Sequence, residues 1–219
     1  MPTGCVIFDC DGTLVDSEPL GNEVFALLLR EQGICMTQQE ALARFVGRKL
    51  AEGIAEVELE SGIKLPSSFI PDLRRRTAAI FKKQLKPVVG ALDLVKSLKV
   101  PICVASSGPR DKIQLSLTLT GLLPYFAGRI FSSYEIGSWK PEPAIFLHAA
   151  EQLSCPPVEC LVVEDSFAGV QAALAAGMHV VAFQPNARDK RIPDHVPVIR
   201  RMADLHEKFF TTGIAGRGD

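Results

Sequence analysis

The sequence predicts an α/β fold in which a doubly wound parallel sheet forms the core and an all-helical cap domain is inserted into it. Apolar, β-branched runs alternate with helix-like segments over residues 87–205, the pattern of a parallel sheet with helices on both faces. A similar short apolar run opens the chain at residues 4–8 and ends at two aspartates, Asp9 and Asp11. Between these parts, residues 17–86 contain helical patterns and no convincing strand.

Each expected strand is a short apolar run bounded by turn residues. Strands are expected at residues 4–8, 100–105, 129–133, 160–163 and 179–183, with an edge strand at 196–199. The helices that separate them are expected at about 89–98, 110–121, 142–153 and 167–176. In sheets of this kind ligands bind at the carboxyl ends of the strands, so the functional residues are expected at that edge.

The inserted segment breaks the alternation. Its helices are expected at about 17–32, 37–44, 49–61 and 67–84. We therefore expect a core domain made of residues 1–16 and 87–219, and a helical cap domain over residues 17–86 that covers the end of the first strand. The hinges between the two are expected near residues 16–19 and 86–90.

Composition restricts the class of partner. The 219 residues carry a formal net charge of −1, which gives no electrostatic case for nucleic acid or an anionic membrane as a partner. No secretory signal pattern is seen, and no apolar stretch approaches the roughly 20 residues of a membrane span. The six cysteines form no Cys-x-x-Cys pair, which predicts reduced, non-catalytic thiols. We expect a cytoplasmic protein, a monomer or weak oligomer, whose polar, Gly-rich tail at 213–219 frays.

Four polar motifs follow or end the expected strands. They are Asp9-x-Asp11-Gly12-Thr13, Ser106-Ser107-Gly108, Lys140-Pro141 and Glu164-Asp165-Ser166. Because the carboxyl ends of parallel strands gather at one edge of a sheet, we expect all four to share one pocket. Each motif alone has a simpler interpretation, since Asp favours turns and Asp165 or Ser166 could merely cap a helix.

That pocket suits phosphoryl transfer. A carboxylate that attacks a phosphate dianion meets a repulsion of about 4 kcal/mol per pair of unit charges at about 4 Å and an effective dielectric of about 20. Mg²⁺ held by Asp9, Asp165 and Glu164 would cancel it, with Lys140 as the second positive charge. Asp9 would then be the nucleophile that forms an aspartyl phosphate, and Asp11 the general acid and base.

Other residues are expected to hold the substrate, a small phosphorylated molecule. Ser106, the backbone N–H of Ser107, and the turn at Gly12 and Thr13 are expected at the phosphate. In the cap, Arg48 and Lys49 lie where a loop would close on the site. Residues 74–76 are three arginines that cannot all face one pocket at 100° per residue; we expect a solvated face, with Arg76 the candidate for a substrate carboxylate.

In this order and on these elements, the four motifs resemble the haloacid dehalogenase superfamily of aspartate-nucleophile phosphatases, in the branch of β-phosphoglucomutase-like and sugar-phosphate phosphatases. The resemblance implies that Asp9 is the nucleophile, and that Asp11 is the acid and base and lends its backbone carbonyl to Mg²⁺. It also implies that Ser106 and Lys140 bind phosphate, while Glu164 and Asp165 complete the metal site. Segments 104–109, 133–143 and 163–169 are similar to bacterial 6-phosphogluconate phosphatases, which implies a sugar-acid phosphate as substrate.

Two alternatives remain open. A phosphomutase of the β-phosphoglucomutase type is one, but Gly21 and Leu50 stand where the mutases carry a histidine and an arginine. A non-catalytic phospho-acceptor switch, like a response-regulator receiver, also gathers carboxylates, Mg²⁺ and a lysine on a doubly wound sheet. Receivers need no helical insertion, however, and the acidic pair at the start of this chain offers both nucleophile and acid.

Overall fold

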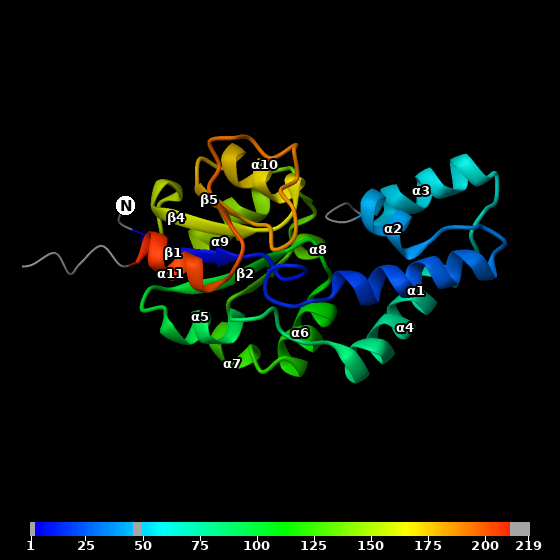
Figure 1. Ribbon diagram of the computed structural model, residues 1–219, viewed down its shortest axis with the longest axis horizontal. Coiled ribbons are helices and arrows are strands. Elements are labelled where there is room, and N and C mark those ends of the chain that lie inside the picture. The colour runs from blue at the N-terminus through cyan, green and yellow to red at the C-terminus, as the bar shows by residue number, and fades with distance from the viewer. Residues whose placement is uncertain (1–2, 46–49, 211–219) are drawn as a thin grey trace, which may run out of the picture.

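The computed structural model describes residues 3–45 and 50–210 and confirms the predicted parallel sheet. Six strands run in parallel in the order β3-β2-β1-β4-β5-β6 (Figure 1). Their bounds are β1 (Cys5–Phe8), β2 (Ile102–Ser106), β3 (Ile130–Ser132), β4 (Cys160–Glu164), β5 (His179–Phe183) and β6 (Val198–Ile199). The sequence placed each of these strands to within two residues at either end.

Helices cover both faces of the sheet because side chains alternate along every strand. Val6 and Phe8 of β1 point into one apolar layer, and Cys5 and Ile7 point into the other. The first layer is closed by α5 (Ala91–Ser97), α6 (Arg110–Leu119), α7 (Leu123–Phe126) and α11 (Ala203–Phe209). The second is closed by α9 (Ala144–Gln152) and α10 (Phe167–Ala175), on the opposite side of the sheet in Figure 1.

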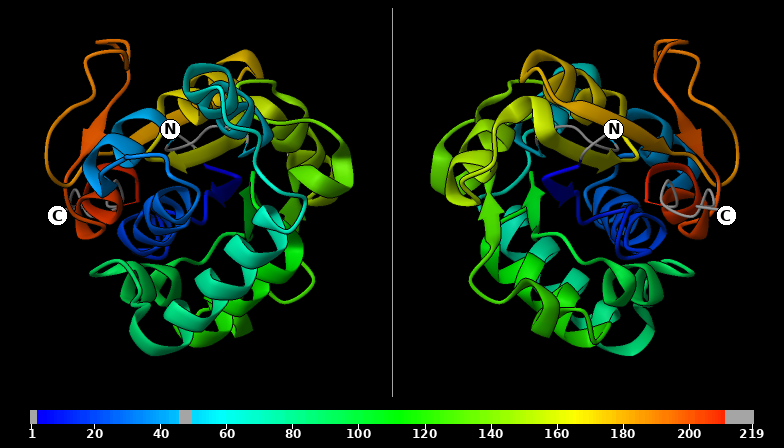
Figure 2. Two further views of the ribbon diagram at one scale, coloured as in Figure 1. Left: turned by 90° about the vertical axis from the view of Figure 1, so that its right-hand side faces the viewer. Right: turned by 90° about the vertical axis from the view of Figure 1, so that its left-hand side faces the viewer.

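The helical insertion, residues 17–86, contains the four predicted helices. They are α1 (Glu18–Glu31), α2 (Gln38–Phe45), α3 (Leu50–Ser61) and α4 (Phe69–Gln84). They enclose an apolar cluster of their own, in which the rings of Phe25 and Phe69 meet edge to face at 5.9 Å. Figures 1 and 2 show these helices beyond the carboxyl ends of the strands, where the polar motifs are expected.

The two chain segments that link the insertion to the sheet run side by side. The backbone N–H of Asp16 donates to the Lys86 carbonyl at 3.0 Å, and the N–H of Val88 donates to the Leu14 carbonyl at 3.0 Å. These two paired segments lie at the predicted hinges, near residues 16–19 and 86–90. The division into two domains at these points stays a prediction, and the tail at 213–219 lies outside the described residues.

Some elements were not predicted. The helices α7, α8 (Ser133–Ile136) and α11 and the short turn at Pro157–Glu159 have too few residues to show a clear hydrophobic period. Strands β2 and β4 extend to Ser106 and Glu164, so the strand itself aims these two side chains. Among the described helices, none combines the length and the apolar character of a membrane span.

Candidate active site

A buried lysine joins the ends of β1 and β4. Lys140 Nζ lies 2.5 Å from Asp9 Oδ1 and 3.0 Å from Glu164 Oε1, and Lys140 is only 6% exposed. Burial disfavours the charged lysine, but Asp9 and Glu164 outweigh burial and raise the pKa of Lys140 above its ordinary value. Lys140 therefore stays positively charged beside a carboxylate that is 131 residues away in the sequence.

Asp9 directly follows β1 and is surrounded by more negative than positive charge. Burial raises the pKa of Asp9 to about 7; Lys140 acts against this increase, while Glu164 and Asp11 add to it. Lys140 alone therefore does not supply enough positive charge to hold this carboxyl fully ionised at neutral pH. A second cation would favour the ionised form.

Three carboxylates offer a place for that cation. Oxygen atoms of Asp9, Glu164 and Asp165 all lie within 4.8 Å of one another. Burial, reinforced by the charges of Glu164 and Asp9, raises the pKa of Asp165 well above its ordinary value. Carboxylate oxygens are the ligands that hard divalent cations such as Mg²⁺ prefer. The donor set and its excess negative charge fit a divalent cation.

Glu164 differs from the other two acids because both of its oxygens already have partners. Glu164 Oε1 accepts from Lys140, while Oε2 accepts from the backbone N–H and the hydroxyl of Ser166 at 3.0 and 2.9 Å. The Ser166 hydroxyl also caps α10 by accepting from Gly169 N at 3.1 Å. Of the two residues considered as helix caps, Ser166 is therefore the cap, and Asp165 is left for another role.

Two glycines make room for these acids. Gly12 has a φ of +77°, and a Cβ on it would lie 2.1 Å from Asp165 Oδ2. A Cβ on Gly169 would lie 2.0 Å from Glu164 Cδ. Thr13 is fully buried, and its hydroxyl donates to Asp165 Oδ1 at 3.4 Å. Gly12 and Thr13, expected at the phosphate, are thus placed against a carboxylate of the candidate metal site.

Asp11 is held by two partners. Asp11 Oδ1 accepts from Ser17 Oγ at 2.6 Å and pairs with Lys112 Nζ at 2.9 Å. Burial acts to raise the pKa of Asp11, but Lys112 and the Ser17 hydrogen bond outweigh it, so the pKa is lowered. Lys112 also lies 5.9 Å from the ring centroid of Phe81 on α4, so it bridges the sheet edge and the helical insertion.

Ser106, the last residue of β2, and Ser107, which follows it, have hydroxyl groups that can form further hydrogen bonds. Ser106 is 1% exposed and its Oγ accepts from the backbone N–H of Gly108 at 3.1 Å. Ser107 Oγ is buried and has no hydrogen-bond partner among the residues that the structure describes. An unpaired buried hydroxyl costs about 1–3 kcal/mol, which an oxygen atom of a bound phosphate would relieve.

All of these groups except Gly12, Thr13, Ser17 and Gly169 line one cavity of about 290 Å³ between the sheet edge and the helical insertion. The insertion contributes the opposite wall. Its lining residues are Glu18, Gly21, Asn22, Phe25, Leu50, Gly53, Leu73, Arg74, Thr77, Ala78 and Phe81. A cavity of this size can accommodate a small phosphorylated metabolite.

Comparisons with known proteins agree with this geometry. Residues 6–183 match the profile of the haloacid dehalogenase-like hydrolases. The chain belongs to this haloacid dehalogenase-like hydrolase family. It is 39% identical to the 6-phosphogluconate phosphatase of Escherichia coli over 85% of each chain, and 30% identical to the phosphorylated carbohydrates phosphatase of Thermotoga maritima over 79% of this chain and 81% of that one. A crystal structure of a haloacid dehalogenase-like protein from Agrobacterium tumefaciens superposes with a TM-score of 0.82 at 34% identity, covering 94% of this chain and 96% of that one.

These findings confirm the predicted family and the predicted class of enzyme, a phosphoric monoester hydrolase of the haloacid dehalogenase type. Phosphatases of this family generally use a divalent metal. The predicted residues Asp9, Asp11, Ser106, Ser107, Lys140, Glu164 and Asp165 all line this cavity. Arg48 and Lys49, predicted at the substrate, lie outside the described residues.

Of the three consecutive arginines, Arg74 lines the cavity, whereas Arg76, the candidate for a substrate carboxylate, does not. Arg76 pairs with Glu31 of α1 through two hydrogen bonds of 2.7 and 2.8 Å, and Arg75 pairs with Asp72 at 3.1 Å. Arg74 lines the cavity of this haloacid dehalogenase-like hydrolase instead. Which of three consecutive residues faces inward depends on how α4 is rotated against its neighbours.

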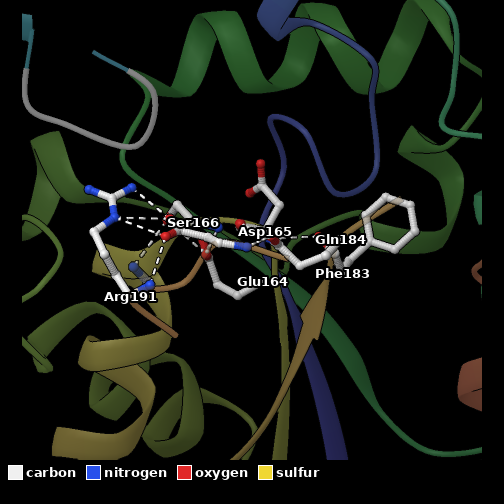
Figure 3. A network of polar contacts seen from close by, with 8 residues as sticks. Glu164, Asp165, Ser166, Phe183, Gln184 and Arg191 are labelled. Atoms are coloured by element: carbon white, nitrogen blue, oxygen red, sulfur yellow. Dashed lines mark hydrogen bonds and ion pairs between the residues drawn. The ribbon is translucent and has the colours of Figure 1, made fainter. Parts of the chain in front are cut away.

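Three further residues of the site were missed in the sequence. Lys112 stands in the first turn of α6, where a positive charge opposes the helix dipole, and that anomaly was the available signal. Gln184, just after β5, donates from Nε2 to the Asp165 carbonyl at 2.5 Å and fixes the backbone there (Figure 3). Glu18 lines the cavity, and burial raises the pKa of Glu18 to about 7. Glu18 ends the motif run that starts at Asp9, but no role was expected for it, and no sequence pattern distinguishes Gln184 from a surface residue.

Proposed function

We propose that this hydrolase is a Mg²⁺-dependent phosphomonoesterase that cleaves a small phosphorylated metabolite through an aspartyl-phosphate intermediate. The observation that carries the proposal is the buried cluster at the ends of β1 and β4. There, Asp9 contacts a charged lysine, lies beside two further carboxylates and opens into a cavity lined by the Ser107 hydroxyl, which has no partner in the described part of the chain. These are the groups that an in-line attack on a phosphate requires.

The chain's own residues divide the reaction into two steps. In the first step a carboxylate oxygen of Asp9 bonds to phosphorus and the bond to the leaving oxygen breaks. Asp11 donates a proton to that oxygen from its protonated form, which is a minority at neutral pH while Lys112 and Ser17 hold its carboxylate. In the second step water attacks the aspartyl phosphate and gives its proton to Asp11, and Asp9 is restored as phosphate leaves. Lys140 and the hydroxyls of Ser106 and Ser107 hold the phosphate oxygens throughout.

Asp9 and Asp165, with the Asp11 carbonyl, would hold the metal directly, and Glu164 would orient Lys140 and act on the metal through water. When bound, the divalent ion supplies the positive charge that keeps the carboxylates ionised and offsets their repulsion of the phosphate. The substrate we propose is a phosphorylated sugar or sugar acid, with 6-phosphogluconate as the first compound to test. The name of the relative from Escherichia coli and the cavity volume of about 290 Å³ support this choice.

The cavity wall favours a phosphatase over a phosphomutase. Gly21 and Leu50, which stand where mutases carry a histidine and an arginine, both line the cavity. A Cβ on Gly21 would meet no atom within 4 Å, so this position leaves open space in the wall. This wall offers no imidazole or guanidinium at the two positions through which a mutase would hold a second phosphate.

The decisive experiment combines one variant with metal removal. Asp9→Asn is nearly isosteric but cannot attack phosphorus, so kcat for p-nitrophenyl phosphate and 6-phosphogluconate should fall by at least about 10³-fold. Chelation should abolish wild-type turnover, and added Mg²⁺ should restore it. The matched control is Asp189→Asn, because Asp189 pairs with Arg191 away from the cavity and this variant should keep wild-type kcat. Turnover by Asp9→Asn near the wild-type rate would refute Asp9 as the nucleophile.

A further inference from the structure

One face of α4 forms part of the cavity wall. Arg74, Thr77, Ala78 and Phe81 line the cavity, and their spacing of three and four residues puts them on the same side of the helix. The phosphate end of the cavity lies opposite, at the strand ends. Arg74 therefore presents a positive charge from the wall that the phosphate site does not use.

The other cations of the cavity are already committed. Lys140 pairs with Asp9 and Glu164, and Lys112 pairs with Asp11. Arg74, in contrast, has no carboxylate partner among the residues that the structure describes. Its guanidinium carbon lies 5.6 Å from the ring centroid of Tyr134, and Tyr134 packs edge to face against Trp139 at 5.3 Å.

This aromatic pair fixes where Arg74 stands. Tyr134 belongs to α8 and lines the cavity, and Trp139 immediately precedes Lys140 in the chain. A cation–π contact uses none of the five N–H donors of a guanidinium, and Arg74 makes no hydrogen bond to any residue that the structure describes, so these donors can serve a ligand. A guanidinium held in this way matches the planar, two-oxygen geometry of a carboxylate.

We propose that Arg74 is a specificity-determining residue that binds a carboxylate at the end of the substrate distant from its phosphate. The hydrolase would thereby prefer phosphorylated sugar acids to neutral sugar phosphates of the same length. This inference rests on the proposed function, because it assumes that the phosphate occupies the end of the cavity at Asp9 and Lys140. It adds the group that recognises the other end of the substrate.

A matched pair of substrates tests the inference. 6-Phosphogluconate and glucitol 6-phosphate are open six-carbon chains that differ only at carbon 1, where one has a carboxylate and the other a CH₂OH group. Arg74→Met should lower kcat/KM for 6-phosphogluconate by about 10- to 100-fold, mainly through KM, because a charge-assisted hydrogen bond is lost. For glucitol 6-phosphate the change should stay within about 3-fold. Arg74→Lys should recover part of the loss, since it keeps the charge without the two-pronged geometry.

Arg75→Met is the matched control, because Arg75 is the neighbouring residue and pairs with Asp72. It should leave both substrates unchanged. An equal loss for the two substrates in Arg74→Met would overturn the inference and point to a phosphate contact or a structural role. The absence of any loss would also overturn the inference. If the wild type turns over neither compound, both are measured as competitive inhibitors of p-nitrophenyl phosphate hydrolysis, where equal inhibition constants also overturn it. Absence of turnover of every phosphate monoester refutes the proposed function itself.

Discussion

The two ends of the sheet carry opposite chemistry although the same strands build both. At the amino end, β1 and β4 begin with Cys5 and Cys160, and with Cys155 their sulfur atoms lie within 4.8 Å of one another. At the carboxyl end, the same two strands lead into Asp9 and Glu164. On each of these strands only three residues thus lie between a thiol of one cluster and a carboxylate of the other.

The two clusters differ in what their burial costs. A thiol is neutral and behaves as a small hydrophobic group. The Cys5 thiol donates to Cys160 Sγ at 3.4 Å, and neither group needs a charged partner. A buried carboxylate is stable only when opposite charge compensates for the water it has lost. The amino end can therefore be purely structural. The carboxyl end depends on Lys140, and in our proposal on a metal ion as well.

The largest effect on stability should come from removing that lysine. Lys140→Met leaves Asp9 and Glu164 buried without their partner, which should lower the free energy of unfolding by about 3–5 kcal/mol in the presence of a chelator. Urea unfolding measures the loss. Mg²⁺ should return part of this stability, because the ion binds only the folded form of the cluster.

Lys112→Met serves as the comparison for Lys140→Met. The side chain of Lys112 is 34% exposed and pairs with one acid, whereas that of Lys140 is 2% exposed and pairs with two. Lys112→Met should therefore cost distinctly less stability than Lys140→Met. Equal losses in the two variants would contradict the view that burial sets the energetics of the carboxyl end.

A smaller effect on stability should follow from replacing Glu18, a further acid at the carboxyl end of the sheet. Burial, with a contribution from Asp11, raises the pKa of Glu18 from 4.5 to about 7. Between these values the folded protein binds more protons than the unfolded chain, so its stability falls as pH rises through this window. The free energy of unfolding that Glu18 contributes should fall by on the order of 1–3 kcal/mol between pH 4.5 and pH 8, and this part of the fall should be absent in Glu18→Gln.

This pH dependence is measured by urea unfolding of the metal-free protein at both ends of the window. Asp9, whose pKa is also raised to about 7, contributes to both proteins, so only the difference between wild type and Glu18→Gln reports on Glu18. Glu23→Gln on the exposed side of α1 is the control and should keep the wild-type slope. A Glu18→Gln slope equal to that of the wild type would show that folding does not raise the pKa of Glu18.

The contrast between the two ends also explains what the sequence could predict. In a parallel sheet each strand ends at the same edge, so a polar motif after a strand can be placed from local pattern alone; Asp9, Ser106 and Glu164 were found in this way. Arg74 was not, because helical periodicity excludes three arginines on one face but does not say which one turns inward. That choice is made by the packing of α4 against α1 and α6, which is long-range. The thiol cluster was equally invisible, since three scattered cysteines give no sign that they meet.

The smallest effect is expected at the amino end and would complete the comparison. Cys160→Ala removes one sulfur atom from a fully buried position, which should cost about 1 kcal/mol of unfolding free energy through lost packing. Because Cys160 stands at the far end of β4 from Glu164, kcat/KM should stay within about 2-fold of the wild type. Cys103→Ala, which removes a buried sulfur from β2 outside the cluster, should cost a similar amount of stability. A much larger loss of stability in Cys160→Ala than in Cys103→Ala would mean that the three thiols stabilise the fold as a unit, and the amino end could then no longer be described as ordinary apolar packing.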